Sequence, residues 1–80
     1  MNLQKLALSL TNNGYTAEVK NDHTLTINGK EVKIIGHLCV TAGHECAFGG
    51  PSDLLKQLWA VGIINSSIDA VTIAETYLNN

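Results

Sequence analysis

The sequence predicts a small α+β protein in which an antiparallel sheet of three to four strands is packed on one face by helices. Apolar residues recur at helical spacing in the first ten positions, and apolar and polar residues alternate from Tyr15 to Thr41. A Gly-Gly-Pro break then precedes a second apolar stripe. Because 80 residues suit one small domain, we expect a single compact unit over residues 1–80, in the order α-β-β-β-α followed by a helix or a strand.

The first expected helix covers about residues 3–11. Its apolar side chains recur three and four positions apart, so they share one helical face: Leu3, Leu6, Ala7 and Leu10. The sequence Asn12-Asn13-Gly14 follows, and Gly14 suits the left-handed conformation that ends many helices. We expect this helix to cover the sheet.

The Asn28-Gly29 pair is a strong signal for a tight β-hairpin, because both residues tolerate positive φ angles. A two-residue turn at this pair sets Leu25 opposite Val32 and Ile27 opposite Lys30. The alternation then separates the side chains onto two faces of the sheet. The apolar face holds Leu25, Ile27, Val32 and Ile34, and the polar face holds Thr24, Thr26, Glu31 and Lys33.

The connection before this hairpin admits two lengths. A two-residue turn would place Glu18 opposite Leu25, on the core side of the sheet. A three-residue loop over residues 21–23 instead pairs Val19 with Leu25 and Ala17 with Ile27. We expect the longer loop, because it buries the apolar set and because Asn, Asp and His tolerate left-handed backbone.

The third strand is expected to run on past its neighbours to Thr41. In that continuous strand Val32, Ile34, Gly36, Leu38 and Val40 face the core. The opposite face then holds Ile35, His37, Cys39 and Thr41. The far half of such a strand needs a second partner, and residues 44–48, after the Ala42-Gly43 turn, are the candidate.

A second helix is expected from Pro51, which suits the first helical position, to about Gly62. The segment after it is ambiguous. Ser66 followed by Asp69 resembles a helix cap, whereas the β-branched residues of 71–76 favour a strand. We favour a helix over residues 67–78 and keep a fourth strand as the alternative.

The motif Gly-His-x-Cys occurs twice, and it supplies the candidate metal ligands His37, Cys39, His44 and Cys46. A two-residue turn at Ala42-Gly43 would set Cys39 opposite Cys46 with both histidines on the same face, but it turns Glu45 toward the core. A three-residue loop pairs Val40 with Cys46 and buries Phe48. We favour the three-residue loop, and therefore free thiols, over a zinc site or a disulfide.

Composition and charge exclude other classes. The chain has no arginine, its five lysines are scattered, and its formal net charge is −2, so we do not expect nucleic-acid binding. Neither a secretory signal nor a membrane-spanning apolar run is evident, and a cytoplasmic location is the default expectation. A flat sheet beside Cys39 offers no cleft for a nucleophile, so we expect no catalytic residue, no enzymatic activity and no cofactor.

What remains is a non-enzymatic module that docks on another protein or protein complex. The expected contact residues lie on the outer sheet face: Glu18, Glu31, Lys33, Ile35 and His37. Small acidic chains of this type are carried by phages and mobile elements, where some act as inhibitors or accessory factors, as anti-CRISPR proteins do. That comparison rests on size and character alone, and no motif supports it.

Two alternatives stay open beside this hypothesis. One is a zinc-binding or redox module that uses the Gly-His-x-Cys repeat. The other is a structural homodimer that associates through an exposed sheet edge or through the helix that contains Trp59. The sequence therefore leaves both a monomer and a homodimer possible.

Overall fold

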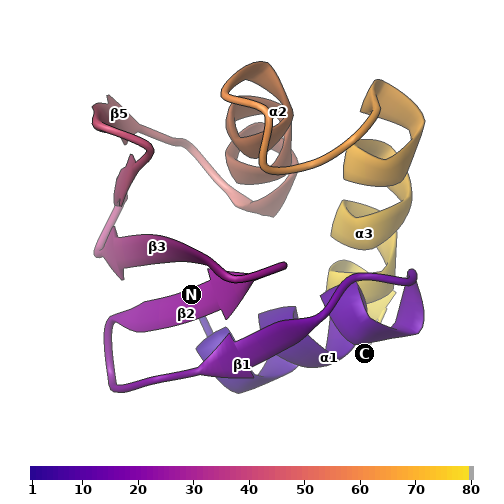
Figure 1. The fold of residues 1–80 in the computed structure, drawn as a ribbon. Helices are drawn as coiled ribbons and strands as arrows, with labels where there is room; N and C mark the ends of the chain where they lie inside the picture. The colour runs from indigo at the N-terminus through magenta and orange to yellow at the C-terminus, as the bar shows by residue number, and fades with distance from the viewer. Residues whose placement is uncertain (80) are drawn as a thin grey trace.

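The computed structural model describes residues 1–79 and confirms the α+β class. One helix is followed by five strands and then by two helices, and the strands form one antiparallel sheet (Figure 1). The sheet thus has one or two strands more than expected. The elements are α1 (Leu3–Asn12), β1 (Ala17–Val19), β2 (Thr24–Ile27), β3 (Lys30–Ile35), β4 (Leu38–Thr41), β5 (His44–Ala47), α2 (Pro51–Ala60) and α3 (Ser67–Asn79).

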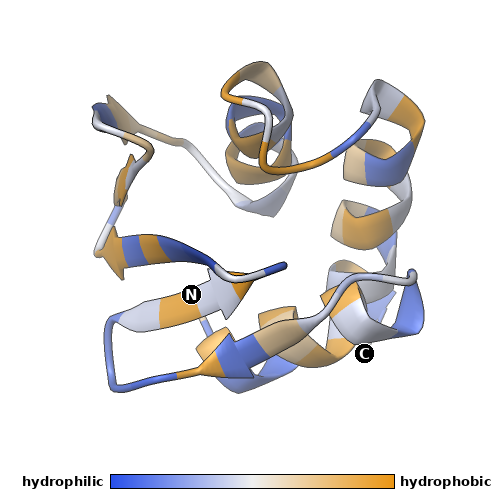
Figure 2. Ribbon diagram, viewed as in Figure 1, coloured by the Kyte–Doolittle hydropathy of each residue, from blue (hydrophilic) through white to orange (hydrophobic). Residues whose placement is uncertain are grey.

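The sheet is a simple meander, in which each strand pairs with the next one along the chain. Short turns join antiparallel neighbours, so no crossover connection is needed. The helices gather on one side of the sheet: α1 packs on β1 and β2, and α2 packs closely against α3 (Figure 1). Bands of apolar and polar residues alternate along β3, as expected for a strand with one face in the core (Figure 2).

The first two predicted registers are confirmed. Val19 pairs with Leu25 and Ala17 with Ile27, as the three-residue loop requires. Leu25 also pairs with Val32, across the turn at Asn28 and Gly29. These two residues have φ angles of 51° and 81°, which is the conformation that a type I′ turn demands.

The prediction of a continuous third strand that runs on to Thr41 is wrong. β3 ends at Ile35, Gly36 and His37 form a two-residue turn, and β4 runs back along β3 with Ile34 opposite Cys39. Gly36 has a φ angle of 59°, as the first position of a type II′ turn requires. Reversal at this turn exchanges the two faces of the following segment, so that Cys39 and Thr41 point to the core, and Leu38 and Val40 point outward.

The prediction of a three-residue loop before β5 is also wrong. Ala42 and Gly43 form a two-residue turn, with φ angles of 52° and 77°, and Cys39 lies opposite Cys46. The objection to this register was that Glu45 would face the core. Because β4 has already reversed its faces, Glu45 points to solvent and is exposed. The expectation that residues 44–48 pair with the far half of the segment is confirmed for His44–Ala47, which form β5.

The ambiguous C-terminal segment is the helix α3. The hydroxyl of Ser66 accepts a hydrogen bond from the backbone N–H of Asp69 at 3.1 Å, which caps the start of the helix. One face of α3 packs into the core, and this packing outweighs the strand preference of the β-branched residues in the segment. The inward residues are Ala70, Ile73, Ala74 and Tyr77.

Candidate functional site: the open sheet face

The side of the sheet away from the core is the candidate functional surface. We call it the open sheet face. Successive residues of a strand point to opposite sides, so the strand registers decide its membership. By register the open sheet face consists of Glu18, Thr24, Thr26, Glu31, Lys33, Ile35, Leu38, Val40, Glu45 and Ala47, of which Thr24 is buried.

An apolar strip crosses this face over three strands. Ile35 of β3 is paired with Leu38 of β4, which is paired in turn with Ala47 of β5. Val40 lies beside Leu38 on the same face. Ile35 is 49% exposed, which is high for a large aliphatic side chain on a central strand. Such a cluster of apolar side chains with polar neighbours is typical of protein interaction sites.

Charged side chains border the apolar strip. Lys33 and Glu45 lie on either side of Val40 in one cross-strand row, and Glu31 lies two residues before Lys33 on β3. Among residues 1–79 the one ion pair within 4.0 Å joins Lys20 to Glu18 at 3.7 Å, at the far edge of the sheet. Glu31, Lys33 and Glu45 therefore have no charged partner of opposite sign in this part of the chain, and they are available to a partner.

Four of the five predicted contact residues lie on the open sheet face: Glu18, Glu31, Lys33 and Ile35. His37 does not lie on a strand, and its predicted position was wrong. The turn at Gly36 and His37 brings the His37 ring within 5.8 Å of the Phe48 ring, and its Nδ1 donates to the Phe48 carbonyl at 3.1 Å. This histidine has a local structural partner.

Sequence reasoning missed four members of the face: Leu38, Val40, Glu45 and Ala47. Their assignment depends on the Gly36-His37 turn. A Gly-x pair is a permitted hairpin signal, but the alternation from Val32 to Val40 continues through it and hides the turn. The Ala42-Gly43 turn was recognised as a candidate, and its rejection followed from the first error.

The four candidate metal ligands do not form a metal site. Cys39 and Cys46 point to the core side of the β4–β5 hairpin, and His44 lies with them beside α2. His37 lies in the preceding turn and bonds to Phe48. Within residues 1–79, no three His, Cys, Asp or Glu side chains are close enough together to hold an ion. The arrangement instead leaves a pair of adjacent thiols.

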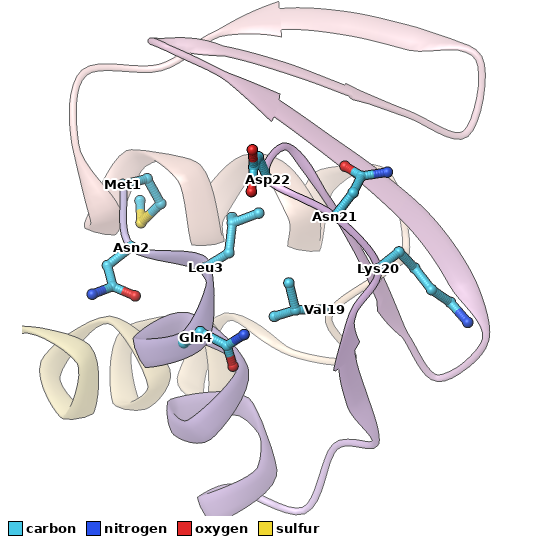
Figure 3. A pocket seen from close by; sticks show the side chains of 8 residues that line it. All are labelled: Met1, Asn2, Leu3, Gln4, Val19, Lys20, Asn21 and Asp22. Atoms are coloured by element: carbon cyan, nitrogen blue, oxygen red, sulfur yellow. The ribbon is translucent and has the colours of Figure 1, made fainter.

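A separate hollow of about 400 Å³ lies between the start of α1 and the loop after β1 (Figure 3). Leu3 and Val19 form its floor, and Lys20, Asn21 and Asp22 lie along the loop at its side (Figure 3). Its lining contains the charged side chains of Lys20 and Asp22 and no cysteine, serine or histidine.

Comparisons with protein-family models, with curated proteins and with solved structures found no match to this chain. Within residues 1–79 no helix has the length and apolar character needed to cross a membrane.

Proposed function

We propose that this protein is a non-enzymatic interaction module that binds a partner protein through the open sheet face. The observation that supports the proposal most directly is the apolar strip of Ile35, Leu38, Val40 and Ala47, which lies outside the core on three adjacent strands. Burial of apolar surface contributes roughly 25 cal/mol for each Å² removed from water. Covering this strip is the main gain that the face offers to a partner.

The charges around the strip indicate the chemistry of that partner. Glu31 and Glu45 border the strip with carboxylates, and Lys33 shares the strand of Glu31 and the cross-strand row of Glu45. A complementary protein surface has an apolar centre, basic side chains opposite the two glutamates and an acidic side chain opposite Lys33. Nucleic acid fits poorly, because its phosphates would meet more carboxylates than ammonium groups.

The role that fits such a module is that of an inhibitor or accessory factor of a larger protein complex, of the type that phages and mobile elements carry. A chain of 80 residues with a net charge of −2 suits this role, because it acts by occupying a surface and needs no reaction centre. Size and charge are the support for this part of the proposal.

A matched pair of isoleucine substitutions tests the proposed surface. Ile35→Lys places a charge in the apolar strip, whereas Ile68→Lys places the same charge on α3, where Ile68 is 75% exposed. Both variants should fold like the wild type. We expect affinity capture from a lysate of the source organism to recover a partner with the wild type and with Ile68→Lys. Recovery with Ile35→Lys should fall at least tenfold.

Two results would contradict the proposal. Equal recovery of the same partner with Ile35→Lys and the wild type would place the contact elsewhere on the molecule. Loss of the partner only with Ile68→Lys would move the interface to α3. Circular dichroism and the melting temperature of both variants separate loss of binding from loss of folding.

A further inference from the structure

The two cysteines of this protein lie directly opposite each other in the β4–β5 hairpin. Cys39 and Cys46 are register partners, and both thiols are free. Facing residues of an antiparallel pair have Cα atoms about 4.5–5.5 Å apart, and disulfides form at Cα separations of roughly 4.4–6.8 Å. Both side chains also point to the same side of the sheet, so the register places the two thiols where a bond between them can form.

The two thiols differ in their access to solvent. Cys39 is 3% exposed, whereas Cys46 is only partly buried. Burial raises the pKa of the Cys39 thiol, and the nearby Cys46 raises it further. Both cysteines line a small hollow together with Thr41, His44, Gln57, Leu58 and Val61. An oxidant that arrives from solvent therefore meets Cys46 first.

We propose that Cys39 and Cys46 are a reversible dithiol–disulfide pair that is oxidised by small-molecule disulfides. The Cys46 thiolate attacks one sulfur of the oxidant, which forms a mixed disulfide and releases the first thiolate. Cys39 then loses its proton, attacks the Cys46 sulfur and displaces the second thiolate. Two protein thiols are oxidised, the oxidant disulfide is reduced to two thiols, and the two protons end on those products.

The bond would join β4 to β5 close to their turn and restrain the unfolded chain at this hairpin. The same two strands present Leu38, Val40, Glu45 and Ala47 on the opposite face. Oxidation thus fixes the strands that form the distal half of the open sheet face. Oxidation of the pair does not depend on the proposed docking role, because it requires only that Cys39 and Cys46 face each other.

The experiment uses the full chain and oxidised glutathione, followed by intact mass measurement without reductant. We expect the wild type to lose two hydrogen atoms, to become unreactive toward a maleimide, and to melt roughly 5–15 °C higher. Cys39→Ala should instead retain one glutathione on Cys46, because no second thiol is present to displace it. Cys46→Ser should remain largely unmodified over the same time, because Cys39 is buried.

Three results would overturn the inference: a wild type that keeps a stable glutathione adduct, one that remains a dithiol, or one that forms a disulfide-linked dimer. The wild-type masses decide between these outcomes even if Cys39→Ala fails to fold. Partner capture with the reduced wild type tests the docking proposal independently, so failure of either proposal leaves the other measurable.

Discussion

At the scale of single residues, the Tyr15 side chain connects two parts of this chain that lie far apart in the sequence. Its hydroxyl donates to the Asp69 carboxylate at 2.6 Å and accepts the backbone N–H of Asn65 at 2.9 Å. The Tyr15 hydroxyl thus joins the segment before β1 to the loop that precedes α3 and to the first turn of α3. The aromatic ring is buried, which removes the hydroxyl from bulk water. Tyr15 thus provides a polar link between the N-terminal and C-terminal parts of the chain, in addition to the hydrogen bond from the Asn2 N–H to the Tyr77 hydroxyl.

Tyr15 should make the protein sensitive to alkaline pH. Burial, and then the hydrogen bond to Asp69, raise the pKa of Tyr15 above its ordinary value of 10.0. The folded state therefore favours the protonated phenol. This contribution to stability is fully present below pH 10 and is lost as the pH rises through 10 toward the folded-state pKa.

Urea unfolding at pH 7 and above pH 10 checks this expectation. Tyr15→Phe should lose about 1–3 kcal/mol at pH 7, because Asp69 and Asn65 lose their partner, and its stability should fall less above pH 10. Tyr77→Phe is the matched control. It removes a hydroxyl that accepts from the Asn2 N–H and leaves Tyr15 intact, so the alkaline fall should persist. An unchanged alkaline fall in Tyr15→Phe would contradict the assignment.

At the scale of the elements, the β4–β5 hairpin carries a residue in a strained conformation. Ala42 has a φ angle of 52°, which is uncommon for a residue with a Cβ atom. The turn keeps this angle because a two-residue connection is needed to place Cys39 opposite Cys46. The positive φ angle of Ala42 therefore lowers the stability of the hairpin locally.

Replacing Ala42 with glycine should relieve that cost. We expect Ala42→Gly to raise the free energy of unfolding by about 0.5–1 kcal/mol, because glycine adopts positive φ angles without a steric penalty. Ala47→Gly, in β5 of the same hairpin, should instead lower it by roughly the same amount. Denaturant midpoints of both variants measure the effect. Two changes of the same sign would show that the flexibility of glycine, and not the turn angle, governs the result.

The elements that sequence reasoning predicted correctly are those where two local signals agree. Between Ala17 and Val32 the turn residues and the apolar alternation select the same registers. Between Ile35 and Ala47 the turn residues and the alternation do not agree, because β4 has apolar or weakly polar residues on both of its faces. Alternation then cannot reveal the reversal at Gly36. One unrecognised turn put Cys39 on the wrong face, gave Cys46 the wrong cross-strand partner and hid four members of the open sheet face.

At the scale of the whole molecule, the two faces of the sheet have different surroundings. Its inner face builds the core with α1, α2 and α3, and fully buried residues such as Leu25, Ile27 and Val32 belong to that face. Its outer face presents an apolar strip with a charged border to solvent. In a chain this small, one buried face must provide most of the stability, and the proposed docking role uses the other face.

Two valines on neighbouring strands test this separation. Val32 lies on the inner face and is fully buried, whereas Val40 lies on the open sheet face and is partly exposed. Val32→Ala removes two methyl groups from the core and should cost about 2–3 kcal/mol of unfolding free energy. Val40→Ala should cost less than about 1 kcal/mol, because that site already contacts water.

Equilibrium unfolding in urea measures both variants under the same conditions. Partner capture should follow the opposite order, with a larger loss for Val40→Ala than for Val32→Ala at a temperature where both remain folded. Equal losses of stability would mean that the outer face is packed as tightly as the core. In that case the apolar strip would serve folding, and the proposed interface would have to lie elsewhere on the molecule.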